Sequence, residues 1–233
     1  MPEEIKSSPF VFYAFYQLYK HFYGTAAPKL TFEAIKQRIF PKYHVDPSEL
    51  QNKKSLFITW KKRTAKSPEH YQLRGCIGTF AKIPLLEGIE RYSLIAALED
   101  HRFPPIAPSE ISSLKCSCNI LQNFKVIYSG SDQKGDIYDW DIGVHGIELR
   151  FKDPQTSTIL SATFLPEVMP EQGWNKKETF ANLIEKAGCY EQVDSVIDNF
   201  QDFFIEVIRY EGNKSEISFD QYQTLQSLAV NTV

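Results

Sequence analysis

Residues 72–80 read QLRGCIGTF, an apolar stretch in which a cysteine stands between two glycines. The stretch SLFITWKK at 55–62 precedes it and is rich in the β-branched and aromatic side chains that favour strands. The polar segment 63–70 separates the two stretches and predicts a loop. Two strands joined by about eight residues indicate an antiparallel pair. We therefore expect residues 72–80 to form the second strand of a hairpin, with its glycines near a site.

Four other stretches carry apolar residues at the spacing of an amphipathic helix. Ser8 can cap the first of them, and Gly24 is suited to its end. Asn175 can cap the last, where Glu178 completes a capping box and Gly188 ends the pattern. These patterns predict helices over 7–24, 31–40, 84–100 and 175–188.

The remaining regular patterns are those of strands. In LKCSCNIL at 114–121, apolar and polar residues alternate as in a half-buried strand, which places Cys116 and Cys118 on the inward face. Short connections between strands and irregularly interspersed helices favour an α+β fold with antiparallel sheets. From Glu211 onward the chain is expected to be a partly loose tail. Further strands are expected at 143–151, 157–166 and 203–210, the first two joined by a turn at 152–156.

The composition is that of an ordinary globular protein, with 42% hydrophobic and 24% charged residues. A net charge of −3 does not favour nucleic acid or anionic lipid as a partner. We expect a cytoplasmic protein, with the nucleus as a second compartment, because the sequence shows neither a transmembrane stretch nor a signal peptide. The four cysteines lack paired spacing, which indicates reduced thiols and argues against zinc. We expect no metal and no cofactor.

Cys76 admits two interpretations. Gly75 and Gly78 free the backbone for tight curvature or for the close approach of a ligand, and their bare amides could hold an oxyanion beside the thiol. A regular strand would place Arg74 on the same face as Cys76, unless a bulge at Gly75 breaks the alternation. A small buried thiol at a strand bend is the other interpretation, and it is the usual one for a single cysteine.

Two further motifs supply candidate site residues. His145, in GVHGIE, is suited to deprotonate a thiol or position a ligand, or else it lies in a bulged strand with its imidazole bonded to the backbone. Arg102, in EDHRFPP, either pairs with Asp100 at a helix end or joins Arg74 around an anionic ligand. Glu148 falls three residues after His145 and is expected on the opposite face of the strand.

Four motifs resemble, in this order, those of the AMMECR family: LRGCIGTF, ALEDHRFPP, GVHGIEL and LPEVMPEQGW. The resemblance covers residues 8–210 and implies an intracellular α+β protein with two lobes around a groove. It therefore implies a single domain over 1–210, followed by a C-terminal tail at 211–233. No settled activity comes with the family. Many of its members have proline where this chain has His101, so His101 is not expected to anchor a mechanism.

Two functions from different classes are open. The favoured one is a binding module that uses the LRGCIG groove to hold a small anionic ligand or a protein partner. The alternative is a Cys-dependent hydrolase or transferase, with Cys76 as nucleophile and His145 as base. For the binding module, the expected ligand-binding residues are Arg74, Gly75, Gly78 and Arg102.

RNA binding ranks third. A basic cluster follows Trp60, and basic residues beside an aromatic ring can bind single-stranded RNA. In an acidic protein, a solvated face explains such a cluster better. The residues concerned are Lys61, Lys62, Arg63 and Lys66.

Overall fold

The computed structural model of the protein describes residues 7–45, 50, 52–64 and 67–230. The chain forms two compact units. Unit 1 comprises Met1–Ile120 together with Asn213–Val233, and unit 2 comprises Leu121–Gly212. Each unit has its own hydrophobic core, so each is described separately.

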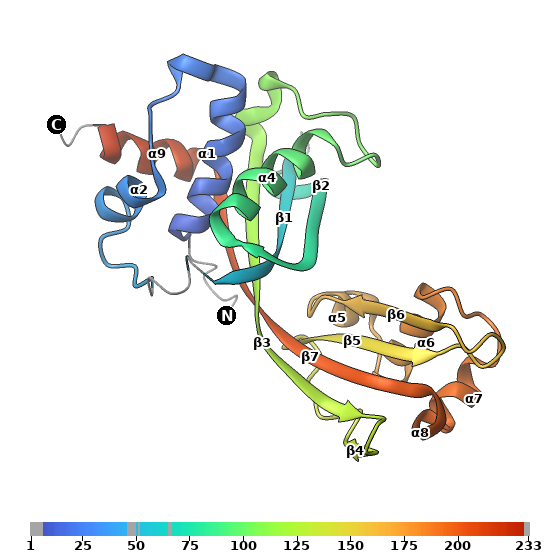
Figure 1. Ribbon diagram of the computed structural model, residues 1–233. Helices are drawn as coiled ribbons and strands as arrows, with labels where there is room; N and C mark the ends of the chain where they lie inside the picture. The colour runs from blue at the N-terminus through green and yellow to red at the C-terminus, as the bar shows by residue number, and fades with distance from the viewer. Residues whose placement is uncertain (1–6, 46–49, 51, 65–66, 231–233) are drawn as a thin grey trace. The chain divides into compact units, whose positions relative to one another are not determined.

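Helices and antiparallel strands together confirm the expected α+β class (Figure 1). The strands are β1 (Lys53–Thr64), β2 (Ser67–Pro84), β3 (Leu114–Ser129), β4 (Lys134–Gly135), β5 (His145–Lys152), β6 (Ile159–Phe164) and β7 (Phe204–Ser218). Hydrogen bonds connect them in the order β2-β1-β3-β7-β5-β6, and β4 pairs with β3. Strands β3 and β7 each contribute residues to both units.

The helices of unit 1 begin and end where local chemistry dictates. The Ser8 hydroxyl accepts a hydrogen bond from the Val11 amide at 3.2 Å, and Gly24 ends the first helix with a φ of +53°. Both caps confirm the prediction. The helices are α1 (Pro9–Tyr23), α2 (Phe32–Arg38), α4 (Leu85–Leu98) and α9 (Phe219–Val230), with 3-10 turns η1 (Gly24–Ala26) and η2 (Pro108–Ser113).

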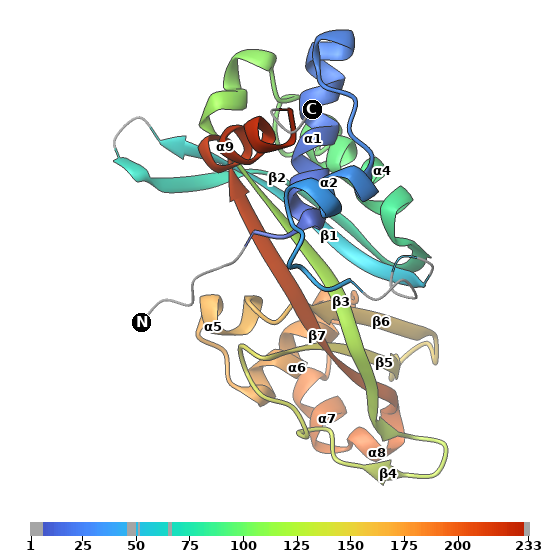
Figure 2. The ribbon, with the colours of Figure 1, turned by 90° about the vertical axis from the view of Figure 1, so that its left-hand side faces the viewer.

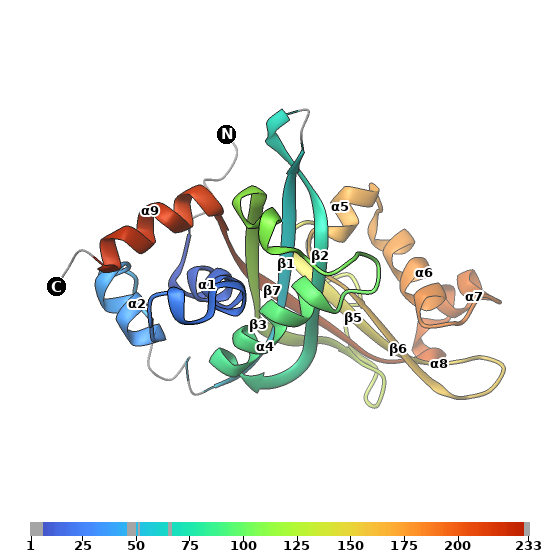
Figure 3. The same cartoon turned by 90° about the horizontal axis from the view of Figure 1, so that it is seen from above.

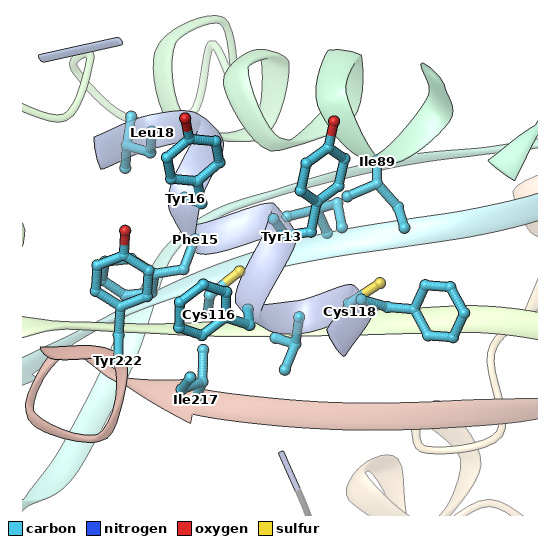
Figure 4. Packing of buried hydrophobic residues seen from close by; sticks show 14 of the residues in the cluster. Tyr13, Phe15, Tyr16, Leu18, Ile89, Cys116, Cys118, Ile217 and Tyr222 are labelled. Carbon is cyan, nitrogen blue, oxygen red and sulfur yellow. The ribbon is translucent and has the colours of Figure 1, made fainter. Parts of the chain in front are cut away.

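Aromatic side chains form the centre of the unit 1 core. The Phe15 ring of α1 lies 5.2 Å from the Trp60 ring of β1 and 4.7 Å from the Tyr222 ring of α9, measured between centroids. Figure 4 shows Phe15 and Tyr222 packed together, with Cys116 and Cys118 of β3 in the same cluster. The apolar stripe predicted for the first helix is therefore core.

Strands β1 and β2 form the predicted antiparallel hairpin. On one face of β1, Leu56, Ile58 and Trp60 are fully buried, and α4 packs against both strands (Figure 1). The predicted loop at 63–70 is wrong in extent, because Arg63 pairs with Tyr71 and the ladder continues toward the tip. Polar side chains occur in an edge strand as readily as in a loop, so the polar composition of 63–70 led to a predicted loop that is too long.

Strand β3 differs from its predicted pattern. Cys116 and Cys118 are fully buried, as expected, but Ser117 and Asn119 between and after them are buried as well. Residues 116–121 of the strand are thus covered on both faces rather than half-buried. Alternation of polarity is a weak guide to burial where small polar side chains can be enclosed.

Unit 2 contains the predicted hairpin of β5 and β6, with α6 packed on both strands (Figure 2). Asn175 caps α6 by accepting from the Glu178 amide at 2.9 Å, and the Glu178 carboxylate accepts from the Asn175 amide at 2.8 Å. This is the predicted capping box. The helices of unit 2 are α5 (Val168–Gln172), α6 (Lys176–Lys186), α7 (Val193–Asp198) and α8 (Phe200–Phe203).

The residues set apart as a C-terminal tail instead form regular structure. Strand β7 continues to Ser218, and α9 follows it and lies beside α2 (Figure 3). Tyr222 is fully buried, with its ring 4.8 Å from that of Phe12. The helix α9 is only weakly amphipathic, which hides it in the sequence. Within the described residues, no helix is both long enough and apolar enough to cross a membrane.

Candidate functional site

The LRGCIG motif lies on β2, which ends the path of paired strands. Trp60 of β1 pairs with Gly75, and the next residue, Lys61, pairs with Leu73, so Arg74 has no residue opposite it. Arg74 is therefore the extra residue of a β-bulge, a feature that re-aims a side chain. The alternative to a regular strand was a bulge at Gly75, and the bulge lies one residue earlier.

Arg74 is held by the structure rather than presented to solvent. Its Nε and Nη2 donate to the two oxygens of Glu110 at 3.1 and 3.0 Å, and its Nη1 donates to the Pro104 carbonyl at 2.7 Å. Only 13% of its side chain is exposed. Glu110, in η2, also accepts from Lys62 Nζ and from the Ala107 amide, each at 2.8 Å. The guanidinium thus joins the motif to the segment that follows α4.

The pKa of Glu110 reports the strength of this arrangement. Burial alone would raise the pKa, but hydrogen bonds from Arg74, from the Ala107 amide and from Lys62 outweigh it and lower the pKa to about 2. The carboxylate is therefore charged throughout the physiological range. Sequence analysis missed Glu110. The available signal was a proline at the first position of η2 followed by a glutamate at the third.

A second ion pair holds the backbone of Cys76. The Cys76 amide donates to Asp100 Oδ2 at 2.8 Å, and the Cys76 carbonyl accepts from Arg102 Nη2 at 3.0 Å. Arg102 also donates from Nε and Nη2 to the buried Asp100 carboxylate, at 2.9 and 2.7 Å. Hydrogen bonds from the Arg102 guanidinium, and after them from the Cys76 amide, hold the pKa of Asp100 well below its usual range.

Both glycines of the motif are required by the chain itself. A Cβ on Gly75 would lie 2.0 Å from the Ala96 carbonyl oxygen of α4, so the helix can approach β2 this closely only at a glycine. A Cβ on Gly78 would lie 2.3 Å from the Leu56 carbonyl oxygen and 2.4 Å from the Phe57 ring. The close approach predicted for a ligand is thus made by α4 and β1.

The Cys76 thiol lies on the face of the hairpin opposite the core. It is partly exposed, and its Sγ lies 3.1 Å from the Thr59 hydroxyl, to which it is hydrogen-bonded. The other three cysteines are buried. Leu73 and Phe80 are 42% and 36% exposed, and the Phe80 ring packs 5.0 Å from that of Phe57. We call this surface the hairpin face: Phe57, Thr59 and Lys61 of β1 with Leu73, Cys76 and Phe80 of β2.

His145 belongs to unit 2, whereas Cys76, Arg74 and Arg102 belong to unit 1. It is buried at the start of β5, where its Nδ1 accepts a hydrogen bond from the Asp141 amide at 2.9 Å. Its Nε2 lies 3.9 Å from Glu211 Oε1. The imidazole therefore closes a turn of its own unit.

Trp60, Lys62 and Arg63 of the basic segment each make contacts within the protein. Trp60 is fully buried and donates from Nε1 to the Ser93 carbonyl at 3.0 Å, so its ring offers no surface on which a base could stack. Lys62 binds Glu110, and Arg63 donates to Asp220 at 2.8 Å. Lys66 lies outside the described residues.

Comparison with known proteins agrees with the motifs. The AMMECR1 family profile matches residues 27–215. An uncharacterised protein of Saccharomyces cerevisiae is 58% identical over 223 residues, covering 93% of this chain and 88% of the yeast protein. An uncharacterised protein of Arabidopsis thaliana is 37% identical over 167 residues, covering 72% of each chain. The crystal structure of an uncharacterised Pyrococcus horikoshii protein has a TM-score of 0.58 at 24% identity, covering 91% of this chain and 93% of that one, which establishes a shared fold.

Proposed function

Because the chain belongs to the AMMECR1 family, we propose that it is a protein-binding module that presents the hairpin face to a partner. The observation that carries this proposal is the pair of ion pairs beneath the LRGCIG strand. Asp100 with Arg102 binds the Cys76 backbone, and Glu110 binds the Arg74 guanidinium.

These two ion pairs support binding because they fix the strand in advance. Bidentate arginine–carboxylate pairs are geometrically specific as well as strong. A surface that is rigid before the partner arrives loses less conformational entropy on association, and so binds more tightly for the same contacts. Two further features fix the same strand: the bulge at Arg74 and the close packing of Gly75 against α4.

A protein partner fits this surface better than a small anion. The N–H groups of Arg74 donate to Glu110 and to the carbonyls of Pro104 and Pro105. An anion could bind Arg74 only by displacing these acceptors. The hairpin face itself offers exposed apolar side chains, Leu73 and Phe80, around a polar centre of Thr59 and Cys76. Apolar anchors with a few hydrogen-bonding groups are typical of protein interfaces.

The Cys-dependent enzyme remains the second candidate, favoured by one observation. The Arg102 guanidinium, whose side chain is 56% exposed, binds the Cys76 carbonyl, and a positive charge beside a thiol is what a nucleophilic cysteine needs. Against it, the Cys76 amide is bound to Asp100 and is thereby occupied as an oxyanion donor. The sulfur is hydrogen-bonded to the Thr59 hydroxyl, and the candidate base His145 belongs to the other unit.

The test places a photo-crosslinking amino acid at Leu73 in cells and, as a matched control, at Tyr190, an exposed aromatic of unit 2. We expect a discrete cross-linked protein from position 73 only, lost on Phe80→Asp and retained in Cys76→Ser. Equal cross-linking from both positions would contradict the proposal. Alkylation of the native protein by iodoacetamide decides the alternative: a fast, Cys76-dependent reaction with a midpoint under about pH 8 would favour the enzyme.

A further inference from the structure

Glu148 of unit 2 has no use in the function proposed above. It lies on β5, opposite Thr163 of β6 and Ile208 of β7, and its side chain is half-buried. Within the described part of the chain, no hydrogen bond or ion pair to its carboxylate is formed. Its neighbour Arg150 pairs instead with Glu206, at 3.7 Å.

Such a carboxylate is unusual, because a charge taken out of water normally has a partner. Burial, and then the nearby charge of Glu206, raise the pKa of Glu148, while Arg150 acts weakly in the opposite direction. In the free protein the charged form of Glu148 therefore lowers the free energy of unfolding, and a positively charged ligand would offset this loss.

Aromatic rings border the same position. The Tyr210 side chain crosses from β7 over Gly146, where a Cβ would lie 2.2 Å from the ring, and its hydroxyl donates to the Phe164 carbonyl of β6 at 2.9 Å. Gly146 and Glu148 are two residues apart on β5 and so share a face. Phe124 of β3 stacks on Tyr210 at 5.2 Å, and 37% of its side chain is exposed.

We propose that Glu148 anchors a binding site for a cationic group, an ammonium or a guanidinium, with the Phe124 ring, stacked on the fully buried Tyr210 ring, as its aromatic wall. A carboxylate supplies the charge, and an aromatic ring adds a cation–π attraction that is strongest where water is excluded. Two sources carry this chemistry: a free small molecule, or a lysine or arginine side chain of another protein. The site lies within unit 2 and is independent of the hairpin face of unit 1.

The full chain is titrated with three cationic probes: arginine amide and lysine amide, each acetylated only on its α-amino group, and a short peptide containing two arginines. Backbone NMR signals of the protein report the binding. We expect saturable shifts at Gly146, Glu148 and Thr163, with affinity reduced about tenfold or more in Glu148→Gln, as loss of a charged contact predicts. Asp198→Asn is the matched control, because its carboxylate also lies in unit 2 and has a partner in Lys177 at 3.0 Å. Its affinity should stay within about threefold of the wild type.

A peptide that binds about tenfold more tightly than either amide assigns the site to a protein side chain, and equal affinities assign it to a small molecule. A second variant, Phe124→Leu, tests the wall without altering the carboxylate; we expect it to weaken the arginine probe by about threefold. The proposal is overturned if Glu148→Gln binds the probes as the wild type does, or if the shifts fall elsewhere.

Discussion

Unit 1 contains two carboxylates, Asp100 and Glu110, that each accept at least three hydrogen bonds, whereas Glu148 in unit 2 accepts none from the described residues. Burial acts on all three in the same direction. The outcome is opposite, since the pKa values of Asp100 and Glu110 are lowered and that of Glu148 is raised. The partners of a buried acid, and not burial alone, thus decide the direction in which its pKa shifts.

The difference also separates two roles. In unit 1 the carboxylates are fully used within the chain, so they hold the LRGCIG strand and have little left for a ligand. In unit 2 the burial of Glu148 is offset only in part, by the charge of Arg150, as the proposed cation site requires. Each of the following predictions tests one side of this contrast.

The largest effect is expected from Asp100→Ala. It leaves the Cys76 amide and the Arg102 guanidinium without their acceptor, so the free energy of unfolding at neutral pH should fall by about 3 kcal/mol. Urea denaturation measures it. His101→Ala, at the exposed next residue, is the control and should change stability by under about 0.5 kcal/mol. A loss below about 1 kcal/mol for Asp100→Ala would break the contrast.

Glu110→Gln should cost less, about 2 kcal/mol at pH 7. All four hydrogen bonds lose a charged acceptor, but the amide oxygen keeps the two donors on its side, while those on the other side face an NH2 group. The pKa of Glu110 is about 2 in the folded protein, against roughly 4.3 when unfolded. A lowered pKa stabilises the protein above the unfolded value, and this stability is lost as the pH falls. The difference between wild type and variant should therefore shrink as the pH falls from about 4.5 toward 2. A pH-independent difference would contradict it.

Glu148→Gln should have the opposite sign and a smaller size. Its pKa is raised in the folded protein, so the charged form destabilises the fold above that pKa, and the cost disappears as the pH falls below roughly 4.3. The variant should be more stable than the wild type at pH 7 by less than about 1 kcal/mol, because solvent screens the half-exposed group. At pH 4 thermal denaturation should show no gain. A loss at pH 7 would mean that Glu148 has a structural partner.

Cys76→Ser should change stability least, by under about 0.5 kcal/mol, since a serine hydroxyl can keep the bond to Thr59. It should nevertheless remove most alkylation of the native protein, because Cys116, Cys118 and Cys189 are buried. Mass spectrometry after brief treatment with iodoacetamide measures the alkylated fraction of the wild type and of the variant, and urea denaturation measures their stability. Labelling that persists in the variant would show that one of the buried thiols is reached from solvent.

Much of this architecture is predictable from the sequence, because local chemistry sets it. The capped helices α1 and α6, the hairpin of β1 with β2 and the hairpin of β5 with β6 all follow from spacing and caps. The motif around Cys76 also stands out, as do Arg74 and Arg102 near it. In these cases the deciding residues are neighbours in the chain.

What could not be predicted depends on residues far apart. Glu110 is recognisable only once η2 folds back to Arg74, and the need for Gly75 only once α4 packs on β2. The helix α9 is only weakly amphipathic, and it is held in place by the packing of Tyr222 against Phe12 and Phe15 of α1. Tertiary context overrides local preference at such places.

The order of the two units along the chain has a consequence for synthesis. Unit 2 is one contiguous stretch, Leu121–Gly212, while unit 1 needs both Met1–Ile120 and Asn213–Val233. A ribosome adds about 5–20 residues per second, so it delivers all of unit 2 before it delivers the last part of unit 1. Phe12 and Phe15 are synthesised before unit 2, yet their partner Tyr222 is synthesised only after all of it. Unit 1 is thus begun before unit 2 and completed only after it, and for those seconds its aromatic core lacks Tyr222 and leaves apolar surface exposed to aggregation.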